Sequence, residues 1–368
     1  MNSGQVILLT GILVASASAL PGCFLLLRRM AMMADAISHA ILPGIVAGYF
    51  IARGPNLLAG FAGAALAAVV TVALVEALQR TGRVAGQAAI GIVFPALFAL
   101  GTVLVSRFFS NVHLDTDAVL YGNIEFSAFE SLLVGDLDLG PQSLWIMGGL
   151  CAINLAFILL LYKELKLATF DPGLAAALGF SPVLIHYALM GILSITAVGA
   201  FTAVGAVLVV ALMIIPAATA YLLTDRLPVM IGLAVACGAL AATLGYGVAV
   251  ALDASVAGAM ATLAGALFGL AFLFAPEQGL VARTRRQARQ RRRFAVETLI
   301  VHLLNHEGTQ NQATESAVAH LGEELRWADR VRDEAITRAA DDGLIARENG
   351  HLALTASGRE TARAVMAR

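Results

Sequence analysis

Residues 203–223 read AVGAVLVVALMIIPAATAYLL, a run without a charged side chain. About 20 apolar residues are enough for a helix to cross a bilayer. Eight further runs of this kind lie near residues 5–27, 36–52, 57–78, 88–105, 144–161, 183–199, 228–251 and 255–275. The stretch 183–223 is too long for one helix, and Gly199 with Gly205 offers a place for a tight reversal. The chain is therefore predicted to be an all-α polytopic membrane protein with about nine transmembrane helices.

Composition divides the chain into unequal parts. Hydrophobic residues make up 59% of the 368 residues and charged residues only 13%, which excludes an ordinary soluble globular protein. Residues 1–280 are nearly uncharged within their apolar runs, whereas residues 281–368 are charge-dense. We predict a transmembrane domain at 1–280, an arginine-rich linker at 281–293 and a small cytoplasmic domain at 294–368. The three cysteines lie far apart in apolar runs and indicate neither a disulfide framework nor a zinc site.

The positive charges of the loops predict the orientation. One set of alternate loops carries Arg28, Arg29, Arg80, Arg83, Lys163, Lys166 and Arg226, and the other set carries only Arg53 and Arg107. Because Lys and Arg favour cytoplasmic loops, we expect the N-terminus outside and the C-terminus in the cytoplasm. The outer stretch 106–143 is acidic and contains Asp115, Asp117, Glu125, Glu130, Asp136 and Asp138. These carboxylates either concentrate cations at an entrance or belong to an ordinary solvated loop.

The second apolar segment contains an ionisable pair, Asp35 and His39. A spacing of four puts both side chains on one face of a helix, where a carboxylate and an imidazole can converge on one divalent transition-metal ion. Ionisable groups at membrane depth are costly and usually face a pathway or the bundle interior. We favour an ion contact over the alternative, a packed and hydrogen-bonded polar pair. Small residues at every fourth position of the same helix predict a close approach by another helix: Ala36, Ala40, Gly44 and Gly48.

A buried asparagine is expected in the fifth segment. Asn154 lies near mid-depth and could supply an oxygen to an ion, but a hydrogen bond to a neighbouring helix is the commoner outcome. We therefore leave it outside the predicted metal site.

Residues 162–180 predict a short cytoplasmic helix with clear ends. Asp171 can cap its N-terminus, Pro172 suits the first helical position, and Gly179 suits the residue after the last turn. A docking surface for a motor subunit would explain such a helix. An ordinary interfacial helix would explain it equally well.

Several strings together resemble the ABC-3 family, the permeases of bacterial manganese, zinc and iron ABC importers. They are LRRMA at 27–31, SHAILPG at 38–44, KEL at 163–165 with FDP at 170–172, and VGAVLVVALMIIPAATA at 204–220. The resemblance covers roughly residues 5–275 and implies a type II importer permease in the bacterial cytoplasmic membrane. It departs at 253–258, DASVAG, where the family usually has a Pro-Ser-Gly-like turn.

The resemblance also implies roles for particular residues. It implies that Asp35 and His39 take part in the passage of the metal. It also implies that the segment of about 163–180 couples the permease to the ATPase. The residues expected to take part are Lys163, Glu164, Phe170, Asp171, Pro172 and Gly179. The transported ion is the substrate, and no permanently bound cofactor is expected. Manganese is favoured because family members with a long tail resemble manganese and broad-range permeases, with zinc or iron as alternatives.

ATP hydrolysis is expected to belong to another subunit, because the sequence contains no Walker A string. The implied partners are an ATPase dimer, a second permease subunit and an extracytoplasmic metal-binding protein. A different class of function is a membrane-tethered, metal-responsive transcription regulator. Nine helices and a docking segment exceed what a tether requires.

The tail after the last apolar run begins with a basic segment that suits anionic lipid headgroups, although nucleic acid is a competing partner. It holds Arg283, Arg285, Arg286, Arg289, Arg291, Arg292 and Arg293. Beyond it we predict helices at 294–306, 315–326 and 328–341, two strands between 343 and 355, and a closing helix from near Ser357. This pattern resembles the winged-helix domains of metal-responsive repressors.

The charge of the tail opposes binding to phosphate. Residues 294–368 hold 8 Arg, no Lys and 12 Asp or Glu, a formal net charge of −4. We therefore expect a regulatory or subunit-contact role, with nucleic acid an unlikely partner. His302, His306, Glu307 and His320 could bind a sensing metal, but surface or core packing is the commoner fate of such residues, and they stay outside the predicted site.

Overall fold

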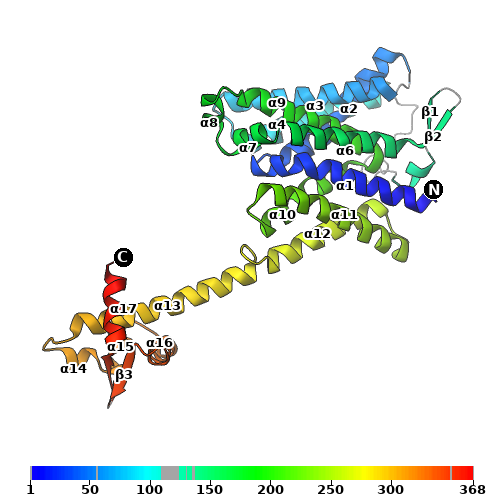
Figure 1. The fold of residues 1–368 in the computed structure, drawn as a ribbon. Helices are drawn as coiled ribbons and strands as arrows, with labels where there is room; N and C mark the ends of the chain where they lie inside the picture. Colours follow the sequence, from blue (N-terminus) through cyan, green and yellow to red (C-terminus); the bar gives the residue numbers. More distant parts are fainter. Residues whose placement is uncertain are drawn as a thin grey trace. The chain divides into compact units, whose positions relative to one another are not determined.

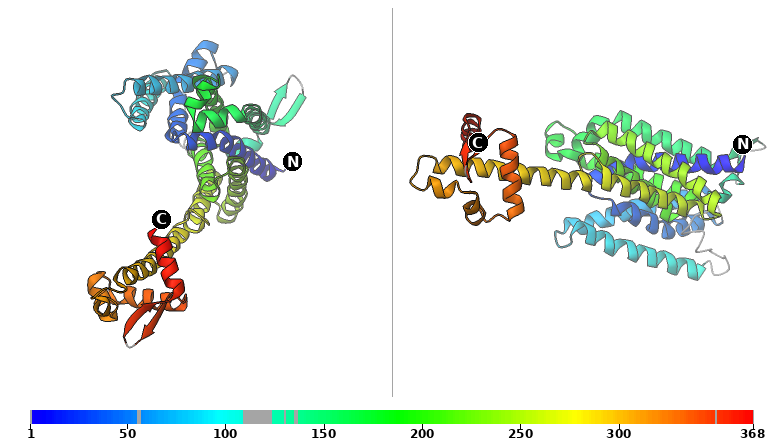
Figure 2. Two further views of the ribbon diagram at one scale, coloured as in Figure 1. Left: turned by 60° about the vertical axis from the view of Figure 1, so that its left-hand side comes forward. Right: turned by 90° about the horizontal axis from the view of Figure 1, so that it is seen from below.

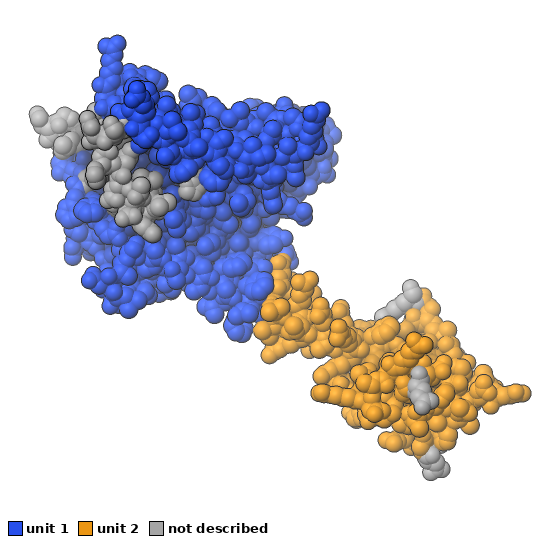
Figure 3. Space-filling view, turned by 180° about the vertical axis from the view of Figure 1, so that it is seen from behind, with its two compact units in different colours: residues 1–276 blue, residues 277–368 orange. Residues whose placement is uncertain are grey.

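The computed structural model describes residues 2–54, 57–108, 124–129, 131–134, 137–348 and 350–367. The chain forms two compact units, unit 1 at Met1–Pro276 and unit 2 at Glu277–Arg368, coloured separately in Figure 3. The described part of unit 1 contains nine helices long and apolar enough to cross a membrane. The predicted all-α membrane fold is confirmed.

The long helices of unit 1 follow one another along the chain. They are α1 (Ser3–Leu27), α2 (Met32–Ala52), α3 (Leu57–Arg80), α4 (Gly86–Phe108), α6 (Gln142–Leu160), α9 (Pro182–Val204), α10 (Ala206–Leu223), α11 (Leu227–Leu252) and α12 (Val256–Phe274). Their connections are short, except between α4 and α6 and between α6 and α9. The division between α9 and α10 falls at Gly205, whose φ of 78° suits a residue without a Cβ. Gly199 lies inside α9.

Helix α1 is the centre of unit 1. It contacts α6 and α9 on one side and α10 and α11 on the other (Figure 1). Its Val14, Ala15 and Phe24 are fully buried. Helix α4 lies at the periphery (Figure 2), and α3 and α4 expose large apolar side chains such as Leu66 and Val103. Such exposure suits lipid or a partner helix.

Short elements fill two connections of unit 1. Between α4 and α6 lie the 3₁₀ helix η1 (Ile124–Ala128) and an antiparallel hairpin of β1 (Ser131–Val134) and β2 (Leu137–Pro141). Between α6 and α9 lie α7 (Tyr162–Phe170) and α8 (Pro172–Ala177). The predicted cytoplasmic segment thus holds two helices, which divide at Asp171, where φ is −145° and ψ is 84°.

Unit 2 is a small mixed domain. Its elements are α13 (Leu280–His306), α14 (Gln312–Glu315), α15 (Val318–Glu324), α16 (Asp329–Asp341), β3 (Ile345–Glu348), β4 (His351–Leu354) and α17 (Ala356–Met366), with β3 and β4 antiparallel. Leu299, Ile300 and Leu303 of α13 pack into its core with Leu321, Ile336 and Leu354. The arginine segment at 281–293 forms the first half of α13. Arg is a good helix former and neither Gly nor Pro interrupts it.

Candidate functional site

Helix α2 carries both predicted metal ligands. Residues four apart on an α-helix are separated by about 40° around the axis, so Asp35 and His39 occupy one face. Asp35 is half-buried, and its neighbours Ala34 and Ala36 are completely buried. The side chain of His39 lies outside what the structure describes. The assignment of an ion to this pair stays a prediction.

Pro43 removes one backbone hydrogen bond from the same part of α2. A proline has no N–H, so Pro43 cannot donate to the carbonyl of His39, four residues earlier in the helix. Pro21 has the same effect on the carbonyl of Ala17 in α1, and there the Asn154 side-chain amide donates to that carbonyl at 2.8 Å. The carbonyl of His39 therefore lacks the helical hydrogen bond that residue 43 would otherwise donate. The sequence contained this signal, but the prediction did not use it.

The side-chain network of Asn154 is structural. Its amide also donates to Thr196 Oγ1 at 2.8 Å, and the Thr196 hydroxyl lies 3.2 Å from Asn154 Oδ1. These bonds join α6 to α1 and α9. The prediction that Asn154 bonds to neighbouring helices is confirmed.

The small residues of α2 let α3 approach closely. A Cβ added at Gly44 would overlap the carbonyl oxygen of Gly63, and one added at Gly48 would overlap that of Ala59. Ala36 and Ala40 are fully buried. The predicted stripe of small residues is confirmed. Because α3 packs against this face of α2, the face is not available to an ion.

A cavity of about 500 Å³ lies where α1, α3, α7 and α9 meet the start of α2. Its polar lining residues are Arg28, Arg29, Glu76, Gln79, Thr169 and His186. Arg28 Nε donates to Thr169 Oγ1 at 3.1 Å, and its Nη1 lies 3.3 Å from His186 Nδ1. Burial lowers the pKa of Arg28, although a guanidinium stays charged at neutral pH. Arg28 therefore ties the end of the central helix to α7 and α9.

The predicted coupling residues lie on α7, on α8 and at their ends. Lys163 and Phe170 are exposed, and Glu164 is half-buried. The Asp171 carboxylate accepts from the Leu174 N–H at 2.9 Å, and Pro172 occupies the first turn of α8. The predicted cap residues of α8 are thus confirmed as caps, and their contact with an ATPase stays a prediction.

Gly179 closes α8 as predicted. Its φ is 87°, its N–H donates to the Ala176 carbonyl at 3.1 Å, and the Phe180 N–H donates to the Ala175 carbonyl at 3.0 Å. These two bonds form a Schellman motif, in which glycine avoids the strain of a left-handed residue. Several apolar side chains around α8 face solvent: Phe170 is 61% exposed, Leu174 47% and Leu178 61%.

Two carboxylates of the predicted acidic loop have local structural roles. Glu125 Oε1 accepts from the backbone N–H of Val256 at 3.1 Å, at the start of α12, where a carboxylate is favoured by the helix dipole. Asp138 accepts from the N–H of Gly140 within β2. Asp115, Asp117, Glu130 and Asp136 lie outside the described residues.

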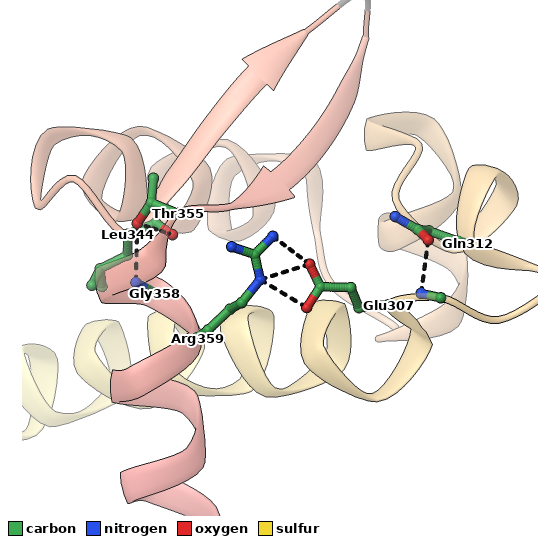
Figure 4. Close-up of polar contacts among 7 residues, drawn as sticks. Glu307, Gln312, Leu344, Thr355, Gly358 and Arg359 are labelled. Atoms are coloured by element: carbon green, nitrogen blue, oxygen red, sulfur yellow. Dashed lines mark hydrogen bonds and ion pairs between the residues drawn. The ribbon is translucent and has the colours of Figure 1, made fainter.

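In unit 2, Glu307 has a partner that sequence reasoning did not anticipate. Arg359 of α17 donates to both carboxylate oxygens at 2.6–3.0 Å (Figure 4). This hydrogen bonding lowers the pKa of Glu307. Thr355 caps α17 by accepting from the Gly358 N–H at 3.0 Å, also visible in Figure 4. Glu307 therefore ties α17 to α13.

Comparison with known proteins identifies the family. The model of the ABC 3 transport family matches residues 4–275. The chain belongs to the ABC 3 transport family. Within it, the zinc transport system membrane protein TroD of Treponema pallidum is 46% identical over 358 residues, or 97% of each chain. The manganese transport system membrane protein MntD of Bacillus subtilis is 44% identical over 277 residues, covering 75% of this chain and 94% of that protein.

A solved structure supports the same assignment. PsaBC from Streptococcus pneumoniae in complex with Fab is similar with a TM-score of 0.63 and 32% identity, covering 76% of this chain and 94% of that chain. The predicted ABC-3 family and its helical permease fold are confirmed. The match with TroD is long enough to include unit 2, whereas the match with MntD has nearly the length of unit 1.

Proposed function

We propose that this chain is the membrane permease of an ATP-driven importer for divalent transition-metal ions, which pass Asp35 and His39 of α2. The observation that carries the proposal is that Asp35 and His39 occupy the same face of α2. The chain also belongs to a family whose relatives are named for zinc and manganese transport. A carboxylate and an imidazole form a mixed oxygen and nitrogen set. Such a set binds both ions, with zinc preferred by intrinsic affinity.

The similar proteins favour neither Mn²⁺ nor Zn²⁺ as the transported ion. The preference for manganese rested on the tail, yet TroD, which matches through the tail, is named for zinc. MntD, which is named for manganese, matches over a shorter length. Iron remains a third candidate of the same chemistry.

Coupling to an ATPase dimer is proposed at α7 and α8. The exposed Phe170, Leu174 and Leu178 are apolar anchors on capped helices outside the long spans. Buried apolar anchors surrounded by polar groups dominate many protein interfaces. A second permease and an extracytoplasmic metal-binding protein complete the proposed importer. We place it in the bacterial cytoplasmic membrane, with the N-terminus outside and the C-terminus inside.

Uptake by the reconstituted importer tests this function. The permease, its ATPase and its partner subunits are placed in vesicles, and ATP-dependent accumulation of radioactive Mn²⁺ or Zn²⁺ is measured. We expect Asp35→Asn and His39→Ala each to reduce uptake to the level without ATP, while the ATPase still copurifies. Asp253→Asn is the matched control, because asparagine also tolerates the left-handed φ of 50° found there. Near-normal uptake by His39→Ala would refute the assignment.

For unit 2 we propose a winged-helix-like domain with a regulatory or subunit-contact role. Its α15, α16, β3, β4 and α17 follow in the order expected of that fold. The net charge of −4 over residues 294–368 supports this role over DNA binding. Truncation after Pro276 should leave basal uptake intact. Absence of ATP-dependent uptake by the full chain, together with salt-sensitive DNA binding, would favour the tethered transcription regulator.

A further inference from the structure

A cluster of histidine and carboxylate side chains lies in unit 2, where α13, α14 and α15 meet. His302 and His306 are one turn apart on α13, with ring centroids 4.7 Å apart. Glu315 ends α14. One ligand atom from each of these three residues lies within 4.8 Å of the other two. His320 of α15 adds a fourth group, with its Nε2 3.4 Å from Glu315 Oε2.

One oxygen of the carboxylate at the centre of this cluster lacks a hydrogen bond. Glu315 Oε2 is buried and has no hydrogen-bond partner within the described residues. An unsatisfied buried carboxylate oxygen is costly, and such an atom in a native protein calls for an explanation. The side chain of His302 is 9% exposed and that of Glu315 is 15% exposed. A cation at this position would give the buried oxygen the partner that it lacks.

The spacing of the ligand atoms identifies the kind of cation. Glu315 Oε2 lies 3.5 Å from His302 Nε2 and 3.4 Å from His320 Nε2. Both distances are long for a charge-assisted hydrogen bond, which measures about 2.7–2.9 Å. Two ligands of a tetrahedral zinc ion, with bonds of about 2.0–2.1 Å, lie about 3.3 Å apart. These two pairs of atoms are therefore spaced as ligands around a small divalent ion.

We propose that His302, His306, Glu315 and His320 bind one divalent transition-metal ion of the Zn²⁺ type in unit 2. His302 Nε2 also lies 3.2 Å from the Glu315 carbonyl oxygen. On binding, the metal would take the Nε2 lone pair, and the ring proton would reside on Nδ1. The ion joins the C-terminal end of α13 to α14 and α15. The site is independent of Asp35 and His39, so it stands whether or not the proposed import function does.

The alternative to a metal is a network of protonated imidazoles around Glu315. Such a network would need no ion and would show no preference among cations. Glu307 does not enter either arrangement, because its carboxylate is held by Arg359. The two readings differ in whether the full chain takes up a stoichiometric ion in tetrahedral geometry.

Cobalt binding to the full-length protein decides between them. The chain is purified in detergent with Asp35→Asn and His39→Ala, so that the proposed cargo ligands are removed, and is titrated with Co²⁺. We expect one equivalent with the intense visible absorption of tetrahedral cobalt, displaced by Zn²⁺. Glu315→Gln and His306→Gln should weaken binding by at least about tenfold. The control Glu324→Gln removes an exposed carboxylate outside the cluster and should leave binding unchanged.

Thermal unfolding distinguishes a variant that has lost the metal site from a variant that has misfolded. Zn²⁺ should raise the unfolding temperature of unit 2 in the parent chain, because a ligand that binds only the folded state stabilises it. Glu315→Gln should unfold at the metal-free temperature of the parent and show no response to Zn²⁺. Equal cobalt binding by Glu315→Gln and Glu324→Gln would overturn the proposal, as would a parent chain without tetrahedral absorption.

Discussion

Unit 1 and unit 2 satisfy their polar groups in different ways. In unit 1, Asn154 is 1% exposed and bonds to a backbone carbonyl and to Thr196. In unit 2, the pair of Glu307 and Arg359 has side chains 30% and 41% exposed. A buried polar group costs about 1–3 kcal/mol when its partner is removed, whereas an exposed ion pair contributes only about 0–1 kcal/mol. Variants of unit 1 should therefore have large effects independent of salt, and variants of unit 2 small effects that depend on pH and salt.

The largest expected effect is at the α2–α3 contact. Gly44→Val should force α2 from α3, because its side chain would overlap the backbone of Gly63. Overpacking of this kind costs about 1–3 kcal/mol or more. Gly60→Val in α3 is the control, since a Cβ there meets open space. We expect Gly44→Val to lower the yield of monodisperse protein and its unfolding temperature, and equal stability of the two variants would contradict the close packing.

Next in size is the loss of the Asn154 network. Asn154→Leu should destabilise unit 1 by about 1–3 kcal/mol, because it leaves the Ala17 carbonyl without the amide that donates to it, while the Thr196 hydroxyl still donates to the Ile192 carbonyl. Adding Thr196→Val to it should cost less than the sum of the single changes, since the two side chains share one network. Thermal unfolding of the three variants measures this coupling. Additive costs would mean that Asn154 acts through packing alone.

A smaller effect is expected at the end of α8. Gly179→Val places a β-branched residue at a φ of 87°, at a cost of roughly 1–3 kcal/mol. It should weaken copurification of the ATPase and reduce uptake, while the long helices remain folded. Gly179→Asn is the matched control, because asparagine tolerates this region. If both variants bind the ATPase at the unmutated level, the geometry of this turn does not matter for docking.

The smallest expected effect is at Glu307. Its pKa is lowered by hydrogen bonds from Arg359, so the pair stabilises the fold fully above the ordinary carboxyl pKa of about 4.3. This stabilisation is lost as the pH falls through the lowered folded value. Glu307→Gln should therefore unfold at a lower temperature than the parent at pH 7, with the difference vanishing in acid and shrinking at high salt. A difference independent of pH would show that the charge is not responsible.

The features that the sequence predicted are those with local signals. The nine spans followed from apolar runs, the break near Gly205 from length and glycine, and the ends of α8 from Asp171, Pro172 and Gly179. Each depends on residues within one or two helical turns. The stripe at Gly44 was equally readable, because helical periodicity places small residues on one face.

The missed features depend on residues distant in sequence. Arg28 bonds to partners 141 and 158 residues away, and nothing near Arg28 indicates them. Glu315 joins His302 through a helix of four residues, too short to predict. Sequence analysis named Glu307 as a possible ligand and left it outside the predicted site; it is nearer to His306 in the chain but bonds to Arg359. Tertiary packing, rather than local propensity, selects among nearby carboxylates.

Charge is distributed unevenly along the sequence of unit 2, and its positive part lies at the start of helix α13. Its first half carries seven arginines between 283 and 293, two of which pair with Glu297 and Glu334, whereas residues 294–368 are net negative. An anionic lipid surface would attract the arginine segment more strongly than the net-negative remainder of unit 2. The Debye length limits that attraction to about 8 Å at physiological salt. A rise in ionic strength would therefore weaken the attraction of the arginine segment to such a surface.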